Sequence, residues 1–521
     1  MDLLTNARIL TLNEQHPEAD WLLIDRGTIV AVGNRAEFEK LPDKIDNEYN
    51  LAGATITPGF TDSHLHLLQY AQSLTRIDCD TPTRQACLET IAKAALHRES
   101  NEWIHGHGWN NHQWGKNEVT KELLDQVVPH HPVYLTNKSL HGAWVNSKAL
   151  QACGIDKNTS DPVGGRIGRD TDGNPTGLLY ESAMRLVADN LPEITEQEAI
   201  QQIENAQEKL FQHGITTVHD FDRLTAFTAL QTLDSQRRLK LRVIKSLPID
   251  SLQEVIKIQL RSGFGSSHLT FRGIKLFMDG ALGTKTAAML EPYENTSETG
   301  MLLMSENDLW SIAQNASLNQ LQLAIHAIGD LANRVVINIF QKLRKWELDH
   351  RRQGLMHRIE HLQTCQLEDI QKLHGLNVAA SVQPIHLASD IPAAEKWLGK
   401  RTRDTYAFNS LFKARIPVIF GSDAPVEQPD CLLGIHTAIH RTQRNNLPSS
   451  GWQPGEKITP LQALTAFTRN PHEYFPLSHV KLGKLSPGYA ADLIVLNDFP
   501  LEPREMSYKD LEIQKTMING E

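Results

Sequence analysis

Two histidines separated by one residue, His64 and His66, stand in the segment TPGFTDSHLHLLQY (57–70), shortly after a Pro-Gly pair. If this segment forms a strand, residues two apart point to the same face, so both imidazoles project side by side. Paired imidazoles of this kind suit zinc or a related divalent ion. The same pair could also end a half-buried strand without any such role, so a metal site requires further ligands.

Four more candidate ligands stand in short apolar segments elsewhere: Lys275 in FRGIKLFMDG, His326 in LQLAIHAIGD, His361 in LMHRIEHLQ and Asp423 in IPVIFGSDAP. Each has an ordinary explanation on its own. A histidine can be a hydrogen-bonded core residue, an aspartate can cap a turn, and an interior lysine can pair with a carboxylate. Six such residues that converge on one point instead favour a metal site.

The elements that would position these residues alternate between strand and helix. Thr195 and Glu198 fit a capping box, and apolar residues then follow at helical spacing as far as Gly214. Eight apolar segments read as strands: 60–66, 215–220, 239–247, 271–280, 321–330, 355–363, 376–384 and 416–425. Eight parallel strands with intervening helices predict an α/β fold, the (β/α)8 TIM barrel, whose chemistry lies at the C-terminal ends of the strands. All six candidate ligands would converge on that mouth.

Composition limits the partners. The 521 residues carry a net charge of −10 and no run of basic residues, which argues against nucleic acid or an anionic membrane surface and favours a small-molecule substrate. No basic segment leads into an apolar stretch at the N-terminus, and no stretch is long enough to span a bilayer, so we expect a cytoplasmic protein. Five scattered cysteines without a C-x-x-C pair argue against a disulfide framework and a thiolate zinc site. The sequence leaves open whether the chain forms a homo-oligomer.

Short strands at both chain ends predict a second, smaller domain. Residues 1–57 and 475–521 each contain strand and turn signals but too few apolar residues for a separate core. We therefore expect one β-sandwich built from both ends beside a barrel of residues 58–474, with a supporting structural role.

An irregular insertion, about 75–195, interrupts the barrel after its first strand, where such a segment usually shapes an active site. It is rich in tryptophan and histidine. We expect Trp109, Trp144 and His141 to line an aromatic pocket with a polar anchor, so that Trp109 and Trp144 contact an apolar or aromatic group of the substrate. The alternative is that the tryptophans pack the core of the insertion itself. For Trp103, this alternative and the pocket explain the residue equally well.

Several segments resemble the metal-dependent amidohydrolase superfamily: PGFTDSHLH, GIKLFMDGALGTKTA, HAIGD, RIEHLQ and GSDAPV. Within it, GHGWNNHQW, PVYLTNKSLHGAWVNSKAL and GGRIGRDTDGNPTGLLYE resemble the branch that contains N-substituted formamide deformylase. The resemblance covers most of the chain. It implies a urease-like architecture with a barrel that carries one or two divalent metals, a β-sandwich from both chain ends, and hydrolysis of non-peptide carbon–nitrogen bonds.

The expected mechanism uses a metal to lower the pKa of water toward neutrality. Asp423 would orient and deprotonate this water, then return the proton to the departing nitrogen of an amide-like substrate. His219, at the end of strand two, or His141 would hydrogen-bond the developing oxyanion. Asp279 is a further candidate for substrate binding.

Lys275 raises a separate question, because its ammonium form is a poor neighbour for two divalent cations. The resemblance implies that carbon dioxide converts the neutral amine into an anionic carbamate that bridges both ions. His64, His66 and Asp423 would then hold the first metal, and His326 and His361 the second. The alternative is a single metal with an unmodified Lys275 turned toward Asp279 or another carboxylate.

Three alternative functions follow from the same barrel. A deaminase of this superfamily would carry His-x-x-Glu after strand five, whereas Gly329 stands at the glutamate position here. An ester or lactone hydrolase would use the same metal chemistry on another carbonyl. A non-catalytic scaffold would lose metal ligands, but this chain retains all six candidates.

Overall fold

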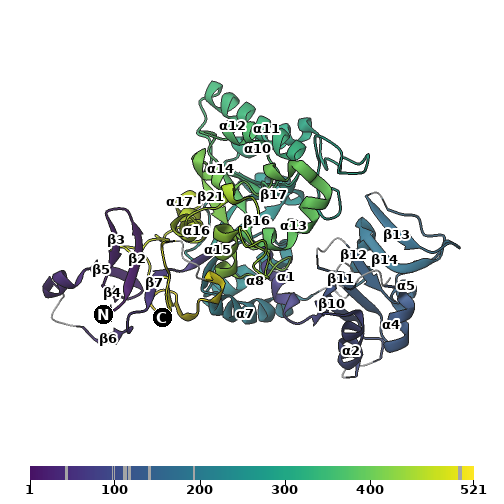
Figure 1. Cartoon of the computed structure of the whole chain (residues 1–521), viewed down its shortest axis with the longest axis horizontal. Coiled ribbons are helices and arrows are strands. Elements are labelled where there is room, and N and C mark those ends of the chain that lie inside the picture. The colour runs from purple at the N-terminus through teal and green to yellow at the C-terminus, as the bar shows by residue number, and fades with distance from the viewer. Residues whose placement is uncertain are drawn as a thin grey trace. The chain divides into compact units, whose positions relative to one another are not determined.

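Eight short apolar segments form the strands of one parallel sheet, at the positions that the sequence predicted. In the computed structural model the order is β8 (Phe60–Leu65), β15 (Ile215–Asp220), β16 (Arg242–Pro248), β17 (Leu269–Phe277), β18 (Gln322–Ala327), β19 (His357–His361), β20 (Val378–Val382) and β21 (Val418–Phe420). A parallel bridge between Leu65 and Ala424 brings the last strand back to the first. The predicted (β/α)8 barrel is therefore confirmed (Figure 1).

The structure describes residues 1–40, 45–96, 98, 100–109, 114, 119–138, 142–162, 164–191, 194–502 and 507–521. These form two units: Met1–Leu68 together with Ala199–Glu521, and Gln69–Glu198. We call the second unit the insertion unit. None of the helices within the described ranges is both long enough and apolar enough to cross a membrane.

Amphipathic helices follow the barrel strands. α7 (Glu196–Gln212) begins at the predicted capping box, where the Thr195 hydroxyl accepts from the Glu198 amide and the Glu198 carboxylate accepts from the Thr195 amide. The longest helix, α11 (Asp330–Asp349), buries its apolar face between neighbouring elements. The others that accompany the barrel are α8 (Leu224–Ser235), α9 (Leu252–Lys257), α10 (Glu306–Leu318), α12 (Leu367–Lys372), α13 (Pro384–Leu398), α14 (Phe408–Lys413), α15 (Cys431–His440), α16 (Pro460–Phe467) and α17 (Arg469–Tyr474).

The two chain ends share a pair of sheets. One sheet has the order β5 (Thr28–Gly33), β4 (Trp21–Asp25), β1 (Asp2–Thr5), β6 (Asn47–Asn50); the other has β23 (Ile513–Met517), β22 (Leu493–Leu496), β7 (Thr55–Pro58), β2 (Arg8–Asn13), β3 (His16–Ala19). Ile9, Leu22 and Ile56 pack in one core with Leu493 and Val495 from the other chain end. Neither end could bury these faces alone, which is the physical reason that both contribute.

The insertion unit is more regular than the sequence suggested. It contains a six-stranded mixed sheet, β13 (Gly165–Arg169), β14 (Pro175–Glu181), β12 (Gly142–Val145), β11 (Val133–Asn137), β10 (Ile104–Trp109) and β9 (Ile77–Asp78). Its helices include α2 (Arg84–Ala95), α4 (Lys121–Val127), α5 (Ser147–Ala152) and α6 (Arg185–Ala188). Two apolar clusters pack around this sheet. The expectation of an irregular segment is therefore corrected, since the unit has a sheet and apolar cores of its own.

Candidate metal centre

Three of the candidate ligands lie close enough to share one ion. A nitrogen of His64, a nitrogen of His361 and a carboxylate oxygen of Asp423 all lie within 4.8 Å of one another. They come from β8, from the last residue of β19 and from the loop after β21, so the barrel topology brings together residues that lie far apart in sequence. Two imidazoles and a carboxylate form a donor set typical of zinc and related divalent ions.

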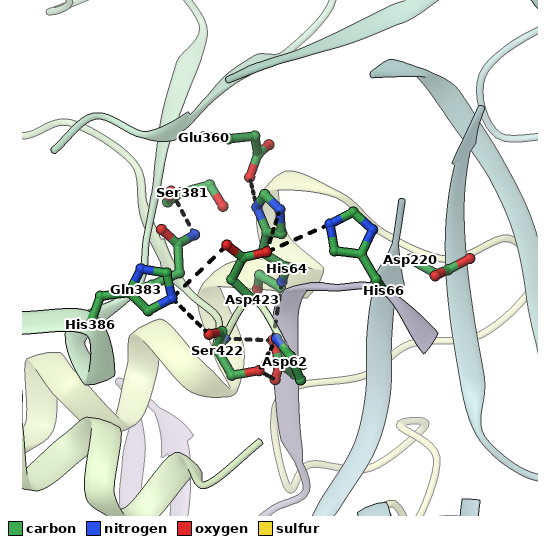
Figure 2. A network of polar contacts seen from close by, with 12 residues as sticks. Asp62, His64, His66, Asp220, Glu360, Ser381, Gln383, His386, Ser422 and Asp423 are labelled. Atoms are coloured by element: carbon green, nitrogen blue, oxygen red, sulfur yellow. Dashed lines mark hydrogen bonds and ion pairs between the residues drawn. The ribbon is translucent and has the colours of Figure 1, made fainter. Parts of the chain in front are cut away.

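His66 faces the same carboxylate. The Nε2 atoms of His64 and His66 lie 3.4 and 3.6 Å from Oδ1 of Asp423, so both imidazoles point at one oxygen (Figure 2). The alternation of a strand therefore places the His-x-His pair as the sequence predicted.

His326 and Lys275 complete the group. The rings of His326 and His361 are 4.5 Å apart, and those of His64 and His361 are 5.0 Å apart. Nζ of Lys275 is buried and has no hydrogen-bond partner among the described residues. Burial lowers the pKa of Lys275 to about 8, against the opposing effect of nearby carboxylates. The alternative pairing of this lysine with Asp279 is thus not seen.

Two of these residues have an uncommon backbone conformation. His361 and Asp423 have φ angles of 71° and 61°, in the left-handed region that side chains other than glycine rarely adopt. Such conformations cost about 1–3 kcal/mol each and cluster at functional sites. The amide of Asp423 donates to the carbonyl of His64 at 2.6 Å, which fixes the loop after β21 against β8.

A buried carboxylate, Glu360, orients His64. Its Oε2 lies 2.6 Å from Nδ1 of His64 and also accepts from Nη2 of Arg358 at 3.0 Å. Because Nδ1 donates to Glu360, Nε2 of His64 keeps its lone pair for the side that faces Asp423. Arg358 also donates to Oγ of Ser381 at 2.6 Å and to Nδ1 of His219 at 2.5 Å.

The hydrogen bond from Arg358 changes the interpretation of His219. Burial, followed by the positive charge of Arg358, lowers the pKa of His219 well below its usual value, so its ring is neutral and accepts from the guanidinium. Its position favours a role in holding Arg358. The predicted contact with an oxyanion stays a prediction, as does the one for His141, which lies outside the described residues.

The sequence interpretation missed His386 and Asp62. Nε2 of His386, on α13, lies 3.1 Å from the carbonyl oxygen of Ser422 and 3.9 Å from Oδ2 of Asp423 (Figure 2). Asp62 accepts from the amides of His64 and Ser422 at 3.1 and 2.9 Å, and burial raises its pKa to about 6. The rule that barrel chemistry lies at strand ends, applied to strand seven, would have found His386.

Asp279 has a structural role, and its predicted contact with substrate stays a prediction. Its carboxylate is fully buried and accepts from the amides of Ile328, Gly329 and Ala288 at 3.0, 2.8 and 2.9 Å. These bonds tie the loop after β17 to the loop after β18, and Oδ1 of Asp279 also lies 3.7 Å from Nε2 of His326.

The two tryptophans are likewise core residues. Trp109 and Trp144 are 3% and 0% exposed in one apolar cluster of the insertion unit. Their indole N–H groups donate to the carbonyls of Leu135 and Thr120, both at 2.9 Å. The packing alternative therefore describes both residues, because their rings are enclosed by apolar side chains of the same unit and their only polar group is already paired.

Known proteins resemble the chain over most of its length. Residues 47–521 match the family described as "Amidohydrolase family" (Amidohydro_3). Protein LONG AFTER FAR-RED 3 of Arabidopsis thaliana is 32% identical over 95% of this chain and 87% of its own. N-substituted formamide deformylase of Arthrobacter pascens is 24% identical over 99% and 97%.

A solved structure is also similar to this chain. An uncharacterized metal-dependent hydrolase from Pyrococcus horikoshii superposes with a TM-score of 0.80 at 26% identity, over 98% of this chain and 99% of that one. The family match, the barrel and the donor set at its C-terminal end agree with the motifs in the sequence, and we conclude that the chain belongs to the amidohydrolase family and is a metal-dependent hydrolase.

Proposed function

We propose that the protein hydrolyses a non-peptide carbon–nitrogen bond of a small amide-like substrate. The observation that carries this proposal is the position of the Asp423 carboxylate. Its Oδ1 faces the imidazoles of His64 and His66, while its Oδ2 faces His386. One oxygen can thus face an ion while the other exchanges a proton with the reacting groups, which suits amide hydrolysis because the leaving nitrogen must be protonated. The formamide deformylase relative supports this bond type.

The residues present fit a divalent metal. Nδ1 of His361 and Nζ of Lys275 are buried without hydrogen-bond partners among the described residues, which is costly unless something else satisfies them. A single ion would be held by His64, His361 and Asp423, whose ligand atoms lie within 4.8 Å of one another. With two ions bound, His64, His66 and Asp423 would hold one, and His326 and His361 the second. A bound ion of this kind supplies Lewis acidity, which polarises a carbonyl and lowers the pKa of water toward neutrality. We propose zinc, because nitrogen and carboxylate donors suit it.

Asp423 performs the proton transfers in this proposal. Its carboxylate accepts the proton of the attacking water and returns it to the departing nitrogen, so the catalyst ends in its starting state. Glu360 keeps the tautomer of His64 fixed throughout, because it accepts from Nδ1. His386 stands on the Oδ2 side and limits how the carboxylate can rotate.

We further propose that Lys275 is carboxylated when two ions are bound. Burial lowers the pKa of this amine to about 8 and so favours its neutral form, whereas the faces of Phe277 and Phe221, with centres 4.5 and 5.1 Å from Nζ, stabilise the ammonium that remains. The neutral amine and carbon dioxide give an anionic carbamate and a proton. This species offers two oxygens where the unmodified amine has no partner among the described side chains.

The test of the carbamate is Lys275→Ala assayed with and without a short carboxylic acid such as propionate. We expect activity to be lost and partly restored by the acid, since its carboxylate can occupy the vacated space. Full activity of the variant without acid, together with one metal per chain in the wild type, would rule out the bridge.

The test of the function is a hydrolysis screen run beside metal analysis. The substrates are N-formyl and N-acyl amines, cyclic amides and lactones, and the protein is purified without added metal. We expect amides to be hydrolysed and metal to co-purify. Hydrolysis of lactones alone would favour the ester alternative, and protein without metal or activity would favour the scaffold.

The deaminase alternative has a steric argument against it. A Cβ atom added at Gly329 would lie 2.0 Å from the carbonyl oxygen of Ala288, a distance that no side chain can adopt. The position that carries a glutamate in such deaminases therefore has no room for one.

A further inference from the structure

Phe277, the last residue of β17, places an aromatic ring beside the candidate metal centre. It follows Lys275 by two residues, so both side chains project from the same face of the strand. The Phe277 ring lies 5.0 Å from the ring of His326, its neighbour on β18, and 4.5 Å from Nζ of Lys275. Phe277 therefore forms part of the wall around these two candidate ligands.

This ring is also exposed. Phe277 is 44% exposed, whereas Leu276 and Met278 on either side are fully buried. The amide of Leu303 donates to the carbonyl of Met278 at 2.8 Å, so the returning loop lies beside the strand end. Leu303 and Met301 on that loop are 54% and 49% exposed. Apolar surface thus gathers within a few residues of the candidate centre.

We propose that Phe277 binds an apolar or aromatic group attached to the scissile amide, and that this contact sets the preference of the enzyme. The inference rests on the proposed function. A substrate whose carbonyl approaches Lys275 and His326 must pass next to the exposed part of this ring. Burying alkyl or aryl surface there is favourable, while a charged group would lose hydration against a ring face that cannot hydrogen-bond it.

The proposal also replaces the tryptophans in the substrate-binding role. Trp109 and Trp144 are almost fully buried, whereas Phe277 combines exposure with contact to two candidate ligands. An aromatic ring next to the reacting centre supplies both apolar area and a flat face for stacking.

The experiment compares the wild type with Phe277→Ala and with Phe264→Ala as the matched control. Phe264 is 70% exposed and precedes the other, amino-terminal end of the same strand, so it offers the same chemistry away from the candidate centre. Each metal-loaded protein is assayed on N-formylbenzylamine, N-formylbutylamine and N-formylglycine. Binding of N-formylbenzylamine is measured by calorimetry as well.

We expect Phe277→Ala to lower kcat/KM for the benzyl substrate about tenfold, chiefly through KM, with a much smaller effect on N-formylglycine. Calorimetry should show a parallel loss of affinity, and Phe264→Ala should match the wild type throughout. Equal losses on all three substrates, or an unchanged aromatic preference, would overturn the proposal. So would a lower Tm with unchanged affinity, which would mean that the ring serves packing.

Failure of the proposed function gives a different result. If the wild type hydrolyses none of these amides, the calorimetric comparison still decides: weaker binding to Phe277→Ala alone supports the contact, and equal binding refutes it.

Discussion

Replacing Glu360 by glutamine tests the link between the buried charges and the candidate metal centre. Glu360 and Arg358 are 0% and 4% exposed, and the carboxylate contacts both the guanidinium and Nδ1 of His64. Glutamine keeps the shape but removes the negative charge. Arg358 would then be a buried cation without its counter-ion, and the acceptor for Nδ1 of His64 would become a neutral amide oxygen, which strengthens the histidine less as a ligand.

Two magnitudes follow. Breaking a buried ion pair by removing one partner costs about 3–5 kcal/mol of stability. Losing the carboxylate behind a metal-binding histidine weakens metal affinity by about 10–100-fold, or roughly 1.4–2.7 kcal/mol. The protein is stripped with a chelator, Zn²⁺ is titrated in competition with a chromophoric ligand, and Tm is measured on the same samples.

The matched control is Glu347→Gln on α11. Glu347 is also buried, and its Oε2 pairs with Nη1 of Arg344 at 2.6 Å, but the pair lies on a helix outside the barrel strands. Both variants should be less stable, while only Glu360→Gln should bind zinc more weakly. Zinc affinity equal to the wild type in Glu360→Gln, or equally weakened in both variants, would refute the assigned role of Glu360.

Three further predictions address other parts of the chain. Alanine at any of the five histidine or aspartate candidate ligands should abolish hydrolysis while circular dichroism stays unchanged, and chelation of the wild type should do the same; normal turnover in two of the variants would contradict the site. Trp144→Ala should destabilise the insertion unit by about 3–5 kcal/mol with little change in KM, because the indole is a core residue. A changed KM at unchanged Tm would instead support contact between Trp144 and the substrate. Burial lowers the pKa of His472 to about 3, so between about pH 6.5 and 3 the unfolded chain binds a proton that the folded chain does not. The free energy of unfolding should therefore fall as the pH is lowered through that window, by up to roughly 1.4 kcal/mol per pH unit. Urea unfolding at several pH values should show that this free energy depends less steeply on pH in His472→Gln than in the wild type. The same pH dependence in both proteins would contradict the prediction.

The barrel was predictable because each strand is a short apolar run bounded by turn signals. The segment ITTVHD coincides with β15, and the strand alternation placed His64 and His66 correctly on one face. The mixed sheet of the insertion unit was not predictable in the same way. Its strands, such as VYLTN of β11 and GAWV of β12, are short, and their pairing depends on partners that no local pattern identifies.

The candidate site shows a second limit. Alternation places Glu360 and His361 on opposite faces of β19, yet Glu360 contacts His64 through Nδ1 while the His361 ring also lies against that of His64. The left-handed φ of His361 ends the alternation at that residue. A backbone conformation imposed by tertiary structure leaves no signature in residue spacing, so the role of Glu360 could not be inferred. The burial of Trp109 and Trp144 likewise depends on packing partners.

The pairing of β7 with β22 has a consequence for how the protein is made. Ile56 lies opposite Val495, so roughly 440 residues must be synthesised between the two partners. At the usual 5–20 residues per second, the first strands wait roughly 20–90 s for the rest of their sheet. During that time their apolar faces have no native cover, and open strand edges of this kind are prone to wrong pairing. Ribosome-bound chains that end before residue 493 should therefore depend on chaperones more than the finished protein does.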